Sequence, residues 1–252
     1  MSETPKGFFD GNPKTMFTFG VVSGMAAILL FNSFAGITYG AGTGSGGSWF
    51  GGSDTNTAEV AAAAKVDAPV VQGTLAEVTD ADHVRGDLAT AKVVVLEYSD
   101  FECPFCSRHH PTLVDIFDDY GSDIAWVYRH FPLSFHPEAE PSALASECAN
   151  EQGKFWEYAD ALFENQDQLG TAYYKSLAKE LGMKTSQFDD CFDTAKYQDV
   201  VDADIASGRA AGVSGTPATF INGVLVAGSN GSSVGAAPKS TFTAIIDAAL
   251  AK

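Results

Sequence analysis

In the C-terminal two thirds of the chain, short continuous apolar runs alternate with segments whose apolar residues recur every three or four positions. This pattern predicts alternating strands and helices. The segments 92–98 (KVVVLEY) and 124–130 (IAWVYRH) are short runs rich in β-branched and aromatic residues, which is typical of buried strands. Helical spacing between them favours a helix over about 103–119. A short turn at 83–87 is expected before the first strand. This part predicts a strand–helix–strand unit.

The stretch from about 137 to 212 repeats its apolar residues at three- and four-residue steps, which predicts a block of helices. Ala143, Leu144 and Cys148 follow this spacing. Turns are expected at Gly153, Gly170, Gly182 and near Thr194.

A β-hairpin is predicted at 218–226, because Asn222-Gly223 supplies the positive φ angles of a tight two-residue turn between two apolar runs. An amphipathic helix at 241–251 closes the chain. Strand, helix, strand, helical block, hairpin and helix together predict an α/β sheet domain over 73–252, interrupted by an all-helical insertion at about 137–212.

The N-terminal part has the pattern of a membrane segment. No charged side chain lies between Thr15 and Ser53, and residues 16–34 supply about the 20 apolar residues of a membrane-spanning helix. Lys6 and Lys14 precede this run, so residues 1–15 are expected in the cytoplasm and 16–39 as an anchor. A cleaved signal peptide is the alternative. Either outcome exports the domain to an oxidising compartment.

Composition adds a tether and an acidic domain. Residues 40–72 are rich in glycine and alanine, as in flexible linkers. The net charge of −17 falls entirely on residues 54–252. Such a domain is a poor partner for nucleic acid or anionic lipid, and the simplest consequence of the charge is solubility.

The motif CPFC at 103–106 directly follows the first predicted strand. A sulfur delivered to the first turn of a helix meets unpaired backbone N–H groups and the helix dipole, which favour a thiolate. Pro104 is tolerated there because its missing N–H would have no partner. Arg108 and His109 offer positive charge one turn later. The motif therefore predicts a dithiol redox site with Cys103 as nucleophile.

Structural zinc is the alternative for these two cysteines. Zinc needs four ligands, but Cys148 and Cys191 are distant and singly spaced. His109 and His110 cannot both turn toward the sulfurs from one helix. Redox chemistry is favoured, and no metal or cofactor is expected.

Several separated motifs resemble the thioredoxin fold with a helical insertion, as in DsbA-like thiol:disulfide oxidoreductases of bacterial envelopes. More narrowly, they are similar to the membrane-anchored or secreted branch of that family. The resemblance runs from about Val84 to the end of the chain. Its motifs are VVVLEYSDFECPFC at 93–106, HFPL at 130–133 with HP at 136–137, ECA at 147–149 with QGKFW at 152–156, and GVSGTP at 212–217 leading to FING at 220–223.

The resemblance implies a role for individual residues. Cys103 matches the exposed cysteine that forms the mixed disulfide with substrate, and Cys106 matches its more buried partner. Thr216 and Pro217 match a cis-proline loop that faces the dithiol and binds substrate backbone. The substrate contacts implied beside this loop are Pro104 and Phe105.

Glu97 occupies the position where the family carries an acidic residue beneath the active site. Partial desolvation there raises a carboxyl pKa, so Glu97 is expected to shuttle the proton of Cys106. A surface glutamate on an edge strand is the alternative. Phe105 departs from the most oxidising relatives, which carry a histidine there, and it offers no donor to the Cys103 thiolate.

Cys148 and Cys191 match two cysteines that some members of this branch join. The resemblance implies a structural disulfide that closes a loop of about 43 residues. The five histidines, His130 and His136 included, are expected as packing or surface residues rather than ligands.

The expected function is an extracytoplasmic oxidoreductase that forms disulfides in exported polypeptides. A membrane-bound or soluble redox partner would reoxidise it. A reductase or isomerase would use the same residues, because direction depends on redox poise. A non-catalytic, chaperone-like module that binds polypeptides is a further alternative.

Overall fold

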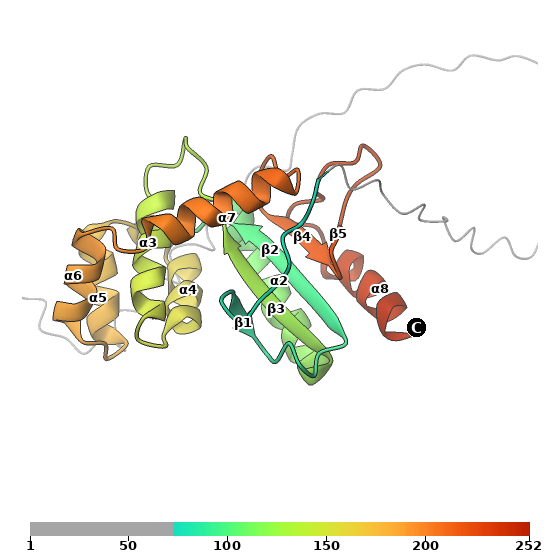
Figure 1. The fold of residues 1–252 in the computed structure, drawn as a ribbon, viewed down its shortest axis with the longest axis horizontal. Helices are drawn as coiled ribbons and strands as arrows, with labels where there is room; N and C mark the ends of the chain where they lie inside the picture. The colour runs from blue at the N-terminus through green and yellow to red at the C-terminus, as the bar shows by residue number, and fades with distance from the viewer. Residues whose placement is uncertain (1–72) are drawn as a thin grey trace, which may run out of the picture. The chain divides into compact units, whose positions relative to one another are not determined.

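A computed structural model describes residues 73–252, which form a five-stranded sheet with helices on both faces (Figure 1). The strand order is β1-β3-β2-β4-β5, with β2 and β3 parallel and the other neighbours antiparallel. The strands are β1 (His83–Arg85), β2 (Val93–Ser99), β3 (Ile124–His130), β4 (Ala218–Ile221) and β5 (Val224–Leu225).

Helices α2 (Pro104–Tyr120) and α8 (Lys239–Leu250) pack on one face of this sheet. Helix α7 (Gln198–Ala210) crosses the other face near the ends of β2 and β3 (Figure 1). The remaining helices form the insertion beside the sheet, namely α3 (Ala139–Asn150), α4 (Phe155–Glu164), α5 (Thr171–Glu180) and α6 (Thr185–Asp193).

The central strand β2 is buried on both faces, which explains its nearly continuous apolar run. Val93 and Val95 pack under α2 and α8, whereas Leu96 and Tyr98 pack under α7. Glu97 follows the alternation of the valines, so its side chain faces α2. Because β3 and β4 flank this strand, the alternative of a surface glutamate on an edge strand is wrong.

The thioredoxin-like α/β fold with a helical insertion is confirmed, and so is the hairpin. Asn222 and Gly223 have φ angles of 48° and 80° in the turn between β4 and β5. One local expectation is wrong. The turn predicted at 83–87 contains strand β1, which pairs antiparallel with residues 126–128 of β3. Three residues give too short a pattern to identify a strand whose partner lies far along the chain.

The predicted N-terminal segments lie outside the described residues. They are the cytoplasmic end at 1–15, the anchor at 16–39 and the tether at 40–72. From residue 73 to residue 252, the structure contains no helix with the length and apolar character needed to cross a bilayer.

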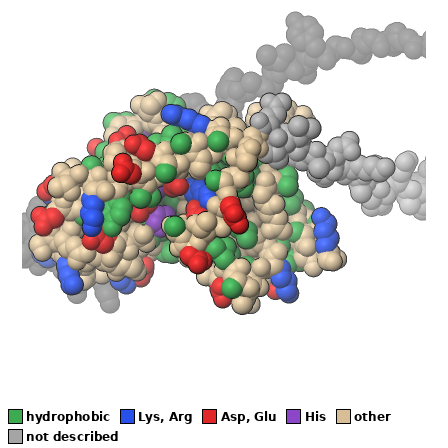
Figure 2. Space-filling model, in the orientation of Figure 1, with side chains coloured by type: hydrophobic (Ala, Val, Ile, Leu, Met, Phe, Trp, Pro, Cys, Tyr) green, Lys and Arg blue, Asp and Glu red, His purple; other side chains and the backbone are tan. Residues whose placement is uncertain are grey.

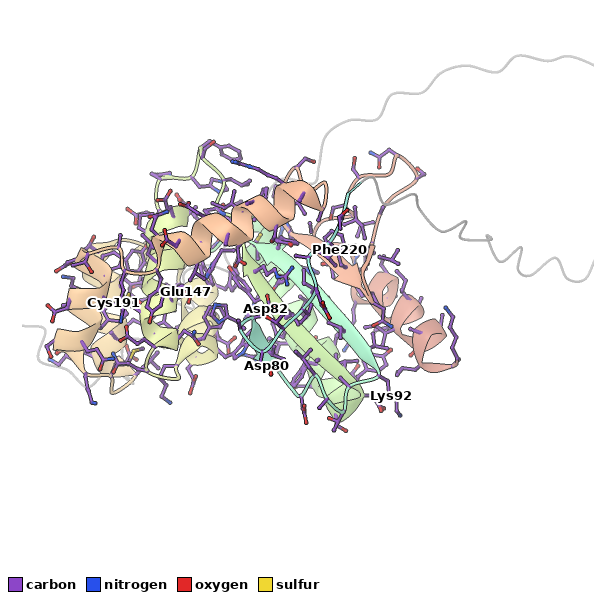
Figure 3. The ribbon with its side chains drawn as sticks, viewed as in Figure 1. Asp80, Asp82, Lys92, Glu147, Cys191 and Phe220 are labelled. Atoms are coloured by element: carbon purple, nitrogen blue, oxygen red, sulfur yellow. A yellow bond between two sulfur atoms is a disulfide. The ribbon has the colours of Figure 1, made fainter. Side chains whose placement is uncertain are left out.

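A disulfide joins Cys148 of α3 to Cys191 of α6, with the two Cα atoms 5.8 Å apart (Figure 3). Both cysteines are buried in the core of the insertion, among aromatic side chains of α4, α5 and α6. Cys103 and Cys106 are free thiols. The four cysteines therefore form two different pairs, the disulfide Cys148–Cys191 and the free thiols Cys103 and Cys106.

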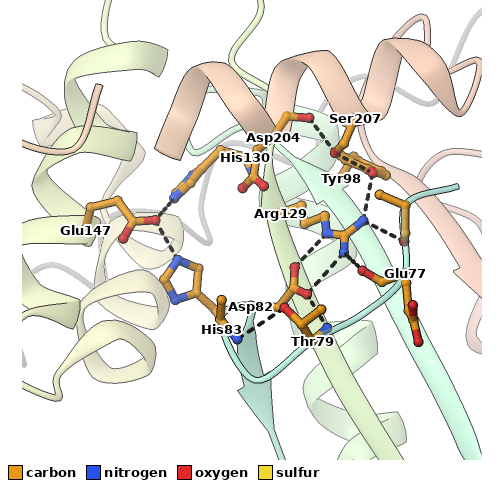
Figure 4. A network of polar contacts seen from close by, with 12 residues as sticks. Glu77, Thr79, Asp82, His83, Tyr98, Arg129, His130, Glu147, Asp204 and Ser207 are labelled. Atoms are coloured by element: carbon orange, nitrogen blue, oxygen red, sulfur yellow. Dashed lines mark hydrogen bonds and ion pairs between the residues drawn. The ribbon is translucent and has the colours of Figure 1, made fainter. Parts of the chain in front are cut away.

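The segment before β1 is held to the sheet by a buried arginine (Figure 4). Arg129 forms an ion pair with Asp82, with Nε 2.6 Å from the carboxylate. Its other nitrogens donate to the backbone carbonyls of Ala76 and Glu77 and to the hydroxyl of Tyr98, at 3.1, 2.9 and 3.2 Å. Residues 76–82 are thus anchored on the face that α7 covers.

Replacing Cys148 and Cys191 together by alanine should lower the free energy of unfolding by about 4 kcal/mol, because the bridge closes a loop of 43 residues in the unfolded chain. Urea unfolding followed by circular dichroism measures the difference. In a background that carries Cys103→Ser and Cys106→Ser, dithiothreitol should lower the stability of the protein with the bridge by a similar amount and leave the variant without it unchanged. Equal stabilities of variant and oxidised protein would contradict a structural role for this bridge.

Candidate active site

Helix α2 begins at the dithiol. Cys103 is its N-cap residue, with extended backbone angles of −71° and 121°, and Pro104 takes the first helical position. The N–H of Ser107 donates to the Cys103 carbonyl at 3.1 Å, which is the first bond of the helix. The Cys103 sulfur lies 3.6 Å from the carbonyl oxygen of Thr216. The helix start and the 212–217 loop thus meet at one sulfur.

The two thiols have opposite acidities. The pKa of Cys103 falls to about 5, chiefly because the Cys106 thiol donates a hydrogen bond to it, and backbone N–H groups of the first turn add to this against desolvation. The pKa of Cys106 rises well above the usual thiol value, because the side chain is desolvated and its neighbour is negative. One thiolate at neutral pH therefore resides on Cys103.

The expectation that Cys103 is exposed is wrong for this structure. Its exposed fraction is 3%, against 1% for Cys106. The Gln166 side chain, from the insertion, donates to the carbonyls of Phe101 and Cys103 at 2.6 and 3.0 Å. The Thr216 carbonyl lies against the sulfur itself. Two segments that are distant in sequence therefore pack against Cys103, one at its carbonyl and one at its sulfur.

His109 does not supply the positive charge that its position suggested. Burial lowers its pKa to about 4, so the ring is neutral, and its Nε2 lies 2.9 Å from the hydroxyl of Thr219. Arg108 points outward, where its guanidinium lies 4.6 Å from the ring centre of Phe105. Phe105 is 53% exposed beside the dithiol.

Glu97 is buried, with 1% of its surface exposed. Desolvation raises its pKa to about 8, although the indole N–H of Trp126 donates to the carboxyl group at 3.2 Å. Burial, followed by the charges of Glu97 and Cys106, raises the pKa of Tyr128. A carboxyl that holds its proton at neutral pH therefore lies buried in the strand that leads to the dithiol.

The Thr216-Pro217 peptide bond is cis. The carbonyl of Pro217 accepts a hydrogen bond of 3.0 Å from the hydroxyl of Ser233. A hollow of about 290 Å³ opens beside this loop, lined also by Gly231 and Leu225. The loop thus presents backbone groups next to Cys103.

The sequence interpretation did not single out Asp100. Its buried carboxylate accepts hydrogen bonds from the N–H groups of Glu102 and Leu133, at 2.8 and 3.0 Å. The Nδ1 atom of His136 lies 2.7 Å from it. These contacts fix the turn that presents Cys103 and tie it to the loop after β3. An aspartate two residues before a turn N–H is a recognisable Asx-turn signal.

Outside the dithiol, one further group of described side chains has metal-ligand chemistry. It consists of His83, His130 and Glu147, whose ligand atoms all lie within 4.8 Å of one another.

The family described as Thioredoxin matches residues 78–247. Among curated proteins, the Na(+)/H(+) antiporter NhaA 1 of Mycolicibacterium vanbaalenii is 41% identical over 148 residues, which cover 58% of this chain and 24% of the antiporter. NhaA 3 of Salinispora tropica is 39% identical over 145 residues, which cover 57% and 22%. This chain thus spans about a quarter of the length of these relatives.

Solved structures with the same fold include BdbD from Bacillus subtilis, with a TM-score of 0.61 and 21% identity over 72% of this chain and 98% of BdbD. DsbA2 from Pseudomonas aeruginosa has a TM-score of 0.53 and 27% identity, over 68% and 96%. A periplasmic thioredoxin-like protein from Salmonella enterica has a TM-score of 0.52 and 21% identity, over 68% and 91%. The family match, the fold and the helical insertion agree, so this chain belongs to the thioredoxin family and has a DsbA-like fold.

Proposed function

We propose that this protein forms disulfide bonds in exported polypeptides outside the cytoplasm, through Cys103 and Cys106. The observation that carries the proposal is the placement of the Cys103 sulfur at the start of α2, where its pKa is about 5. A thiolate stabilised in this way favours the reduced form of the pair, and a pair that prefers to be reduced is an oxidant.

The reaction starts from the disulfide form of the pair. A substrate thiolate attacks the Cys103 sulfur, the bond to Cys106 breaks, and Cys106 leaves with the electron pair. The second substrate thiolate then attacks the substrate sulfur of this mixed disulfide, and Cys103 leaves as a thiolate. Two substrate thiols become one disulfide, while the protein's disulfide becomes a dithiol.

Glu97 supplies the proton that the leaving Cys106 needs. Its carboxyl group is still protonated at neutral pH, and Cys106 is the weaker acid of the two thiols. Transfer to Cys106 therefore avoids a second buried thiolate beside Cys103. In the reverse direction Glu97 takes this proton back.

The substrate backbone lies across Thr216 and Pro217, beside the hollow of about 290 Å³. Pro104 and the exposed ring of Phe105 form the opposite side of this binding site. The Thr216 carbonyl already touches the sulfur, so a bound polypeptide displaces this contact as it reaches Cys103.

The domain acts from the membrane, with 1–15 in the cytoplasm, 16–39 as the anchor and 40–72 as the tether. The periplasmic neighbour from Salmonella is consistent with this location. The partners are exported polypeptides with cysteine thiols, and a membrane-bound or soluble redox protein that restores the disulfide.

Insulin reduction and oxidation of a reduced peptide, measured side by side, test the direction. We expect rapid peptide oxidation, slow insulin reduction and a reduction potential well above about −200 mV. A potential near the thioredoxin value of about −270 mV would make the protein a reductase. If Cys103→Ser kept full activity in assisted refolding, a chaperone-like module would replace the redox proposal.

Alkylation of the reduced protein by iodoacetamide should follow a titration with a midpoint near pH 5, because the thiolate of Cys103 is the reacting species. Cys106→Ala should move this midpoint upward, since it removes the strongest hydrogen bond to the thiolate. Cys106→Ser keeps a donor and serves as the matched control, with a smaller shift. A midpoint at the ordinary thiol value in the native protein would contradict the mechanism.

Glu97→Gln should slow the release of Cys106 at neutral pH by about 100-fold, the lower end of the range for a lost acid–base group. It should also stabilise the protein as pH rises. Folded Glu97 keeps its proton up to about pH 8, whereas the unfolded chain releases it near 4.5, so the native protein loses stability between these values.

Glutamine is neutral throughout, so the stability difference should widen from about pH 4.5 and level off near pH 8, on the order of 5 kcal/mol. Urea unfolding at several pH values measures it, and stopped-flow mixing with a reduced peptide measures the rate. Glu164→Gln, an exposed site, is the control and should change neither. A constant difference across this pH range would rule out a neutral buried Glu97.

A further inference from the structure

A second cluster of reactive side chains is built where β1, β3 and α3 meet (Figure 4). His83 comes from β1, His130 from the end of β3 and Glu147 from α3. Their exposed fractions are 8%, 0% and 2%. Two imidazoles and one carboxylate thus converge in a largely dry site that shares no residue with the dithiol.

We propose that His83, His130 and Glu147 form a divalent metal site of the zinc class. One oxygen of Glu147 lies 2.6 Å from Nε2 of His83 and 3.0 Å from Nε2 of His130. Two histidines and a glutamate are a known set of three protein ligands for zinc, with a fourth position left for water. The three side chains supply this set without any rearrangement of the backbone.

The spacing of the ligand atoms fits an ion after small side-chain movements. In a tetrahedral zinc site with N and O ligands, neighbouring ligand atoms lie about 3.3 to 3.5 Å apart, from the metal–ligand distances. The three atoms of the cluster already lie within 4.8 Å of one another. Adjustments of about an ångström therefore convert the hydrogen-bonded arrangement into a coordinated one.

The local charge also favours a cation. No lysine or arginine in residues 73–252 forms an ion pair with Glu147, whose partners are the two imidazoles. A second carboxylate, Asp204, accepts the backbone N–H of His130 at 2.8 Å. Burial of a carboxylate is costly unless its charge is compensated, and a divalent ion bound between these side chains compensates it.

The histidine tautomers leave the ring nitrogens available. The Nδ1 atom of His130 is buried without a hydrogen-bond partner among the described residues. In the hydrogen-bonded arrangement the Nε2–H of His130 donates to Glu147. Because Nδ1 has no partner among the described residues, it can carry the ring proton once a metal takes the place of the Nε2 hydrogen, and Nε2 then presents its lone pair to the metal.

An approach from solvent reaches His83. This residue lines a hollow of about 440 Å³ together with Asp80, Asp82, Asp87 and Glu157. Figure 2 shows histidine atoms at the surface where the helical insertion meets the sheet, on a face that also carries acidic side chains. The acidic wall attracts cations, and the hollow leaves room for water as the fourth ligand.

The test uses the full-length protein without a histidine tag. Cys103→Ser and Cys106→Ser are introduced together, so that the dithiol cannot bind the metal. Equilibrium dialysis against Zn²⁺ should find one equivalent bound, and Co²⁺ should give the absorption of a four-coordinate site without thiolate bands. No bound metal in this host would overturn the proposal.

Ligand variants in the same host locate the site. His83→Gln or Glu147→Gln should weaken zinc binding by more than the about 10- to 100-fold that loss of an outer-shell partner costs. His136→Gln and Asp80→Asn are matched controls, a histidine elsewhere and an acid of the hollow, and should keep one bound equivalent. Unchanged binding in His83→Gln would place the metal elsewhere and overturn the proposal.

A second measurement needs no ligand variant and so does not depend on the folding of the variants. Zinc added to the host should shift the ring nitrogen signals of His83 and His130 in NMR spectra and leave those of His136 in place. Shifts confined to His136, or none, would also overturn the assignment.

Discussion

A negative charge held on one sulfur is the constraint on which the site depends. The first turn of α2 supplies the N–H groups, Cys106 supplies a hydrogen bond, and the Thr216 side chain also lowers the pKa of this sulfur. Each contact comes from a different part of the chain, so the fold has to bring β2, α2 and the 212–217 loop to one point. The antiparallel pairing of β2 with β4 makes this possible, because it places Ala218, at the start of β4, opposite Tyr98, near the end of β2.

The same arrangement places groups in the core that reduce stability. Glu97 lies in the central strand of the sheet, two residues after Val95, and remains uncharged there at neutral pH. A hydrophobic residue at this position would pack without desolvating a carboxyl group. Cys106 is likewise cut off from water, and burial raises the pKa of its thiol. Burial of the Glu97 carboxyl thus lowers the stability of the fold and at the same time keeps a proton next to the strand end that carries the dithiol.

Local patterns in the sequence were sufficient to predict much of the fold and the position of the dithiol. The apolar runs identified β2 and β3, Asn222-Gly223 identified the hairpin, and the cysteine spacing behind a strand identified the dithiol. The failures have tertiary causes. β1 is defined by its pairing with β3, His109 is neutral because Thr219 and α8 enclose it, and Cys103 is covered by a glutamine of the insertion. Hydrophobic periodicity does not predict these tertiary contacts, because each of them joins segments that are distant along the chain.

The anchoring of residues 76–82 by Arg129 determines how mechanical load would enter the domain. A pull on the chain at residue 73 would act first on this arginine and on the hydrogen bond between Thr74 and Ala210. Both contacts lie on the face covered by α7, whereas α2 packs on the opposite face. Tension in whatever precedes the domain would therefore enter at the end of α7, two residues before the 212–217 loop that contacts the Cys103 sulfur, so load on residue 73 is passed toward the nucleophile.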